Sequence, residues 1–274
     1  MNLFNIFLFI NFFMILFYLF DKMICVPIIY YVKKDLENIK KDYDRTRWYL
    51  LHICINILCA ITSFNGLYLT FNNVHTSLIP IKFAEPYTKE WLFGPTSPLP
   101  SLIVTSGHLY HILFFGTSKS DIYHHLFFAF PMPIINMIGD YGFARNVIHS
   151  VLCGFPGIIE YIIMSLYKLG FIVKKRMRLY ITIMHCILRL PLGLITSYSL
   201  IYQVFLSSEV ANPILTFLVG ILVLVNSIQY CFENILSSIR QYSVRNDNSK
   251  VFLNPKPFAE CKDLKSIEIT KKLK

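Results

Sequence analysis

The chain has 274 residues, of which 55% are hydrophobic and 15% are charged, and its formal net charge is +10. Soluble domains carry about 25% charged residues, so this composition excludes an ordinary soluble domain and indicates a membrane protein. The basic residues lie mainly between hydrophobic runs, whereas a nucleic-acid-binding protein gathers them on a soluble face. The seven cysteines show no CxxC or zinc-ribbon spacing, which favours small residues packed between helices over a metal or disulfide framework.

Seven hydrophobic runs are long enough to be membrane spans, which need about 20 residues each. The first run precedes Asp21 and Lys22 and lacks both a basic leading segment and a small-residue cleavage site. We therefore expect a retained anchor rather than a cleaved signal peptide. The seven runs cover approximately residues 3–20, 48–71, 100–116, 122–139, 146–167, 179–205 and 213–232.

The basic residues divide unequally between the two sets of connecting segments. Segments 21–47, 117–121 and 168–178 and the tail from 236 hold 22 of them, against three in the opposite loops. Since cytosolic loops carry the excess of Lys and Arg, the sequence predicts a lumenal N-terminus and a cytosolic C-terminus. We expect the basic tail to stay flexible beside an anionic cytosolic leaflet.

Prolines interrupt two of the predicted spans. Pro131 and Pro133 lie in the fourth, and Pro191 with Gly193 lies in the sixth. Such breaks free backbone groups that neighbouring helices or cavity water must satisfy. The pattern fits kinked helices around a cavity and simple packing kinks equally well.

Polar residues recur in spans three to seven, which predicts one shared polar interior, because polar groups in a bilayer normally face a pathway or a pocket. His108 and His111 lie three residues apart and so share one helical face. His124 and His125 begin the fourth span, with Asp121 one turn before them. The remaining polar residues are Ser106, Tyr110, Tyr123, Asn136, Asn146, His149, Glu160, Tyr161, His185, Arg189, Asn226, Gln229 and Glu233.

Three chemistries could use these histidines. A membrane di-iron centre needs about eight histidines in HxxxH and HxxHH clusters, and the HxxHH pattern is absent. A zinc site could use His108, His111 and one member of the pair. Metal-free acid–base or acyl-transfer chemistry needs only a histidine that takes a proton and a carboxylate that orients it. Asp121 beside His124 and His125 makes the third the simplest, and no bound metal or cofactor is expected.

The motif Lys119-Ser-Asp-Ile-Tyr-His-His-Leu-Phe-Phe resembles the central motif of the TLC-domain family, which includes TRAM, Lag1 and CLN8 proteins. His149 follows 24 residues after His125, and the same span continues to Glu160 and Lys168. The start Arg45-Thr-Arg-Trp48 is similar to the opening of such a domain. The likeness covers about residues 45–235. Within the family, the chain is distantly similar to ceramide synthases.

This resemblance implies a six-helix membrane barrel around a lipid-sized cavity, plus one N-terminal helix, and hence an all-α membrane protein. By position, His124 and His125 would be the catalytic pair, with Asp121 orienting them. His149 and Glu160 would be polar lining. His108 and His111, selected because they share one helical face, are predicted to line the same substrate site. The sequence departs from the ceramide-synthase pattern, because Phe127 follows the pair closely and Ser150 stands where an acid follows the second-motif histidine.

The predicted organisation is an N-terminal helix and basic linker over 1–44, a membrane domain over 45–235 and a cytosolic tail over 236–274. The predicted function is acyl transfer from acyl-CoA to a lipid amine or hydroxyl in the endoplasmic reticulum or another endomembrane. The alternative is a non-catalytic lipid sensor, carrier or trafficking factor with the same cavity. A channel or transporter would predict inverted repeats, which are not evident. The expected partners are membrane lipids and acyl-CoA but not nucleic acid, with self-association left open.

Overall fold

The computed structural model is mostly helical in the part of the chain that it describes, and no strand occurs there. That part comprises residues 3–32, 36–72, 88–117, 122, 125, 126, 130, 131, 133, 135, 144–206 and 213–243. Five of its helices are long and apolar enough to cross a membrane, as expected of a multi-pass membrane protein. These are Leu3–Val32, Asp42–Asn72, Arg145–Lys168, Lys174–Phe205 and Pro213–Arg240.

The first helix is longer than the sequence predicts. Helix α1, Leu3–Phe20, runs on through a π-helical turn, Asp21–Cys25, into α2, Val26–Val32. The predicted end at residue 20 is therefore wrong. Asp21 was taken as the polar flank of the span, but its side chain is fully buried against Arg47, so it does not have to reach water.

The other helices lie at the predicted runs, but α3 begins 12 residues earlier than predicted and α12 ends 11 residues later. Helix α5 has 16 residues and is shorter than the five candidate spans. The predicted fourth span, 122–139, lies mostly outside the described residues, as does the tail beyond 243. The helices are α3 (Leu36–Asn72), α4 (Lys89–Phe93), α5 (Leu99–Phe114), α8 (Ala144–His149), α9 (Phe155–Lys168), α10 (Lys174–Met184), α11 (Leu190–Leu206) and α12 (Pro213–Ser243), with π-helical turns at Ser150–Gly154 and His185–Arg189.

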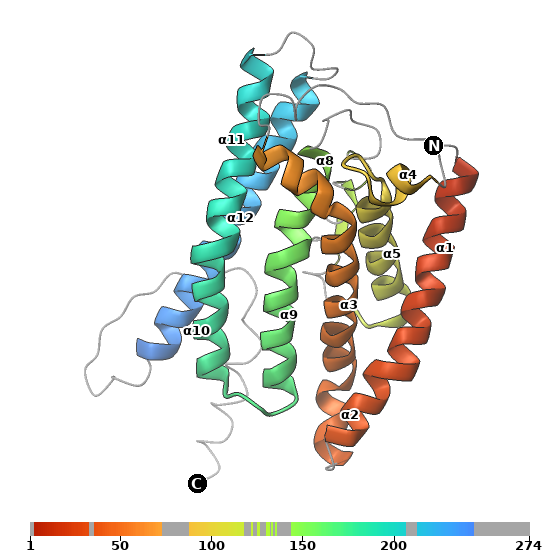
Figure 1. Ribbon diagram of the computed structural model, residues 1–274. Helices are drawn as coiled ribbons and strands as arrows, with labels where there is room; N and C mark the ends of the chain where they lie inside the picture. Colours follow the sequence, from red (N-terminus) through yellow and green to blue (C-terminus); the bar gives the residue numbers. More distant parts are fainter. Residues whose placement is uncertain are drawn as a thin grey trace.

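The bundle has two packed parts (Figure 1). In the first, α3 packs against α5, α8 and α9, and α1 packs on α5. Its apolar core includes Phe17, Leu51 and Leu102, which are completely buried. In the second, α11 packs along α12, and α10 packs against both α9 and α12. A smaller cluster around Leu200 and Val223 joins α11 and α12 to α8.

Glycines let α11 and α12 approach each other closely, as small residues do between membrane helices. A Cβ atom on Gly193 would overlap the side chain of Ser227, and one on Gly220 would lie 2.8 Å from Ile201 Cγ1. Gly193 and Pro191 directly follow the π-helical turn His185–Arg189. The predicted break in the sixth span is therefore a local π-helical turn within one continuous candidate span.

The ends of the helices at which basic loops were predicted lie together (Figure 1). Helix α2, the start of α3, the end of α9 and the start of α10 occupy the same end of the bundle. Lys168 Nζ donates to Asp42 Oδ1 at 2.7 Å, which ties the end of α9 to α3. We call this end of the molecule the basic end, and the predicted cytosolic location applies to it.

Candidate functional site

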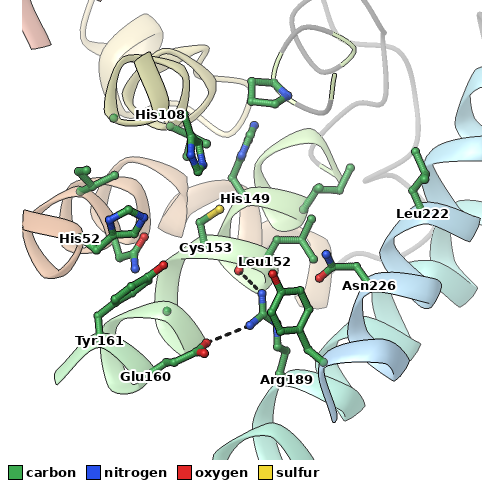
Figure 2. A pocket seen from close by; sticks show the side chains of 18 residues that line it. His52, His108, His149, Leu152, Cys153, Glu160, Tyr161, Arg189, Leu222 and Asn226 are labelled. Atoms are coloured by element: carbon green, nitrogen blue, oxygen red, sulfur yellow. Dashed lines mark hydrogen bonds and ion pairs between the residues drawn. The ribbon is translucent and has the colours of Figure 1, made fainter. Parts of the chain in front are cut away.

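A cavity of about 120 Å³ lies between the two parts of the bundle. Its wall comes from α3, α5, α8, α9, α12 and both later π-helical turns. Figure 2 shows polar side chains from these helices pointing toward one space. The polar residues that line it are His52, Asn56, His108, His149, Glu160, Tyr161, Arg189, Asn226 and Tyr230.

These polar groups lie near the middle of their spans. Asn56 is the fifteenth of 31 residues in the candidate span of α3, and Asn226 is the fourteenth of 28 in that of α12. Arg189 is the sixteenth of 32 in the span that joins α10 and α11. Polar and ionisable residues at this depth are expensive and are rarely retained without a role. The cavity is therefore the strongest candidate for a functional site.

An ion pair crosses the floor of the cavity (Figure 2). Arg189 Nη1 donates to Glu160 Oε2 at 3.1 Å, and Nη2 donates to the carbonyl of Leu152 at 3.0 Å. The guanidinium also stands over the ring of Tyr230, 4.4 Å from its centroid. His185 Nε2 lies 3.5 Å from the same Glu160 oxygen. A buried charge without a partner costs several kcal/mol, and these contacts offset that cost.

A second cluster, of imidazoles, connects the cavity with the basic end. His111 Nδ1 and His125 Nε2 share a hydrogen bond of 3.3 Å. The ring of His108, which lines the cavity, is 4.9 Å from that of His125. His111 stacks on Trp48 with ring centroids 3.8 Å apart. The shared face predicted for His108 and His111 is confirmed, since both contact His125.

His52 belongs to the same site, although the sequence analysis did not select it. Its ring lies 3.6 Å from that of Trp48 and 4.1 Å from that of Tyr161, between centroids. Trp48, His52 and Asn56 follow one another at four-residue intervals along α3. That spacing places all three on one face, and it was the signal in the sequence that could have identified His52.

His149 forms the wall next to α3 and α5. Its Nε2 shares a hydrogen bond of 2.7 Å with Ser101 Oγ on α5. The next residue, Ser150, bonds to Ser63 on α3, with 2.5 Å between the hydroxyl oxygens. Ser150 opens the π-helical turn Ser150–Gly154, and such turns are frequent at functional sites. The hydroxyl of Ser150 therefore links this turn to α3.

The predicted catalytic group is described only in part. His125 is buried, whereas Asp121 and His124 lie outside the described residues. His108, His149 and Glu160 line one cavity, as expected from the prediction of one shared polar interior. His111 does not line it but supports His125. Glu160 lies beside Arg189, a partner that the sequence analysis did not assign.

The prediction that Gln229 and Glu233 belong to the interior is wrong. Gln229 Nε2 donates to Glu233 Oε1 at 3.1 Å on the exposed side of α12. The two side chains satisfy each other one helical turn apart, so neither needs an interior partner. Tyr110 does not line the cavity either. Its hydroxyl donates to Asp21 in the π-helical turn after α1.

The helices and the cavity are those expected of a multi-pass membrane protein that has a cavity between its spans, lined in part by polar side chains. Within the described residues, no three His, Cys, Asp or Glu side chains are grouped so that they could hold a metal ion. No protein-family model matches the chain, and neither a curated protein nor a solved structure is significantly similar to it.

Proposed function

We propose that this protein is a membrane acyltransferase that joins a fatty acyl group from acyl-CoA to a lipid amine or hydroxyl. The observation that carries the proposal is the imidazole cluster, in which His108 lines the cavity and the buried His125 lies directly beside it. Imidazole is the side chain best suited to take and return a proton near neutral pH. The resemblance of the motif around His124 and His125 to TLC-domain proteins supports the same reaction.

In this mechanism the acceptor nitrogen or oxygen attacks the thioester carbonyl of acyl-CoA. One histidine of the pair takes the proton from the acceptor as the new bond forms. The carbon–sulfur bond then breaks, and the leaving thiolate recovers the proton. His111 holds the ring of His125 through the 3.3 Å hydrogen bond, which keeps the base in position. Asp121 keeps its proposed role as an orienting group.

The proposed orientation places the basic end in the cytosol, with the N-terminus lumenal in an endomembrane such as the endoplasmic reticulum. His111 lies in the last turn of α5 and contacts Trp48, the seventh residue of the candidate span Asp42–Asn72. A water-soluble donor such as acyl-CoA would approach from this end. Lys174, Lys175 and Arg176 at the start of α10 would attract its phosphates.

A second candidate is a lipid carrier or sensor that uses the same cavity without chemistry. The specific observation in its favour is that Glu160 is bonded to Arg189 and lies next to His185. A carboxylate engaged in this way is less able to activate a histidine. The two candidates share a lipid ligand and differ only in whether a bond forms.

The discriminating experiment is lipidomic comparison of cells that express the wild type with cells that express His124→Ala/His125→Ala. Gln203→Met serves as a matched control, because Gln203 is buried on α11 but does not line the cavity. The acyltransferase proposal predicts acylated lipids that accumulate with the wild type and the control but not with the double variant. If the double variant is folded and abundant and reproduces every lipid change, the catalytic proposal fails.

A further inference from the structure

We infer that the cavity receives the head group of a lipid that is uncharged and carries a hydroxyl or amide group. The inference deepens the proposed function, on which it rests for the assumption that the ligand is a lipid. The inference concerns the kind of lipid that is recognised. It is argued from Asn56, Asn226 and the Glu160–Arg189 pair, which line the cavity.

Two carboxamide groups at the cavity have an unused hydrogen-bonding atom. Asn56 Nδ2 and Asn226 Oδ1 are buried, and neither has a hydrogen-bond partner among the described residues. The side chains are 3% and 8% exposed, and Figure 2 shows Asn226 pointing from α12 into the cavity. A buried polar atom without a partner costs about 1–3 kcal/mol. Both residues line the same cavity, which indicates a ligand that supplies both bonds.

The space around the Asn56 side chain depends on helix α9, which packs against α3. Gly157 of α9 faces it, and a Cβ atom at that position would lie 2.5 Å from Asn56 Nδ2. The chain therefore has a residue without a side chain where the carboxamide needs space. Asn56 lies on α3 and Asn226 on α12, so the ligand would contact both packed parts of the bundle.

The charges at the cavity argue for an uncharged head group. The carboxylate of Glu160 and the guanidinium of Arg189 neutralise each other across 3.1 Å. A phosphate would bring negative charge into the middle of the membrane, beside the carboxylate of Glu160, which lies 3.1 Å from the guanidinium. A hydroxyl or an amide both donates and accepts one hydrogen bond without adding charge. Two carboxamides offer both kinds of partner in either orientation of their oxygen and nitrogen atoms.

The orphaned atoms also predict how substitutions affect stability. Replacing a buried amide that has no partner with leucine removes a desolvated polar group and keeps a similar volume. The empty protein should therefore be as stable as the wild type or more stable, while the ligand loses its hydrogen bond. A residue with only a structural role would show the reverse, with loss of stability and no specific loss of binding.

The experiment compares four probes with the same C18 chain length on the purified full-length protein in detergent. The probes are 1-monooleoylglycerol, oleamide, 1-oleoyl-lysophosphatidic acid and 1-octadecene. Binding is titrated by native mass spectrometry and by the shift of the unfolding midpoint. Wild type, Asn226→Leu and Asn56→Leu are compared with Gln203→Met, which changes an orphaned buried amide outside the cavity.

We expect monooleoylglycerol or oleamide to bind the wild type and Gln203→Met at least about tenfold more tightly than the phosphate or the alkene binds. Each asparagine variant should lose about tenfold in that affinity without a lower midpoint in the absence of ligand. Equal or tighter binding of the phosphate, or unchanged binding by both asparagine variants, would overturn the inference. Selective binding without acyl transfer would uphold it and would overturn the proposed acyltransferase activity.

Discussion

The ion pair between Glu160 and Arg189 gives a quantitative prediction. Replacing Arg189 with methionine leaves the Glu160 carboxylate in a site where only 15% of its side chain is exposed. Removing one partner of a buried pair costs about 3–5 kcal/mol. His185, 3.5 Å from the same oxygen, keeps part of the stabilisation, so the expected loss is at the lower limit, about 3 kcal/mol.

The reverse substitution, Glu160→Gln, should be milder. Arg189 keeps its hydrogen bond to the Leu152 carbonyl and its contact with the Tyr230 ring. The double variant Glu160→Gln/Arg189→Met removes both charges, and buried pairs replaced by uncharged groups are often close to neutral. The double variant should therefore be more stable than Arg189→Met alone. In a double-mutant cycle the coupling should exceed about 1 kcal/mol.

The assay is thermal unfolding of the purified variants in one detergent. A loss of about 3 kcal/mol corresponds to a midpoint lower by roughly 6–12 °C for a chain of this size. Glu233→Gln is the matched control, because Glu233 forms a similar contact with Gln229 on the exposed side of α12. It should change stability by no more than about 0.5 kcal/mol. If Arg189→Met matches this control, or if the two single effects are simply additive, the reasoning is refuted.

Three further predictions concern the packing that supports the cavity. Asp21→Asn should destabilise the protein by about 3 kcal/mol, because it removes the buried carboxylate that pairs with Arg47 and leaves only the exposed Asp44 as a charged partner. Thermal unfolding measures this, and a wild-type midpoint would contradict it. Gly193→Val should separate α11 from α12 and cost about 1–3 kcal/mol, whereas an unchanged midpoint would mean that the two helices do not approach closely there. Cys186 and Cys231, whose sulfur atoms are 3.5 Å apart, should form a disulfide under copper-catalysed oxidation. Mass spectrometry of peptides detects it, and its absence would argue against the contact between the turn after α10 and α12.

Hydrophobicity predicted where most helices lie, because a bilayer requires long apolar runs. It did not predict that the first helix continues through Asp21. The reason is that Arg47, which neutralises Asp21, lies 26 residues further along the chain. Local sequence signals indicate that a charge ends a span, and only the packing of α3 beside α1 shows that this charge is paired.

The sequence predicted which residues belong to the site more accurately than it predicted which residues they contact. His108, His149 and Glu160 were identified because polar side chains are costly in a membrane. The pairing of Glu160 with Arg189 depends on how α9 faces the turn between α10 and α11, and no local pattern encodes that contact. His52 was missed because it was treated as part of an apolar run, although its four-residue spacing from Trp48 indicated a shared face.

The most direct test of acyl transfer is a reconstituted reaction. Purified protein is incubated with oleoyl-CoA labelled in the acyl group and with a total lipid extract as the source of acceptors. The proposal predicts a labelled lipid product that forms with the wild type and with Gln203→Met but falls by at least about 100-fold with His125→Gln, as expected when a general base is removed. Absence of any labelled product from folded wild-type protein, or equal product from folded His125→Gln, would contradict the proposed reaction.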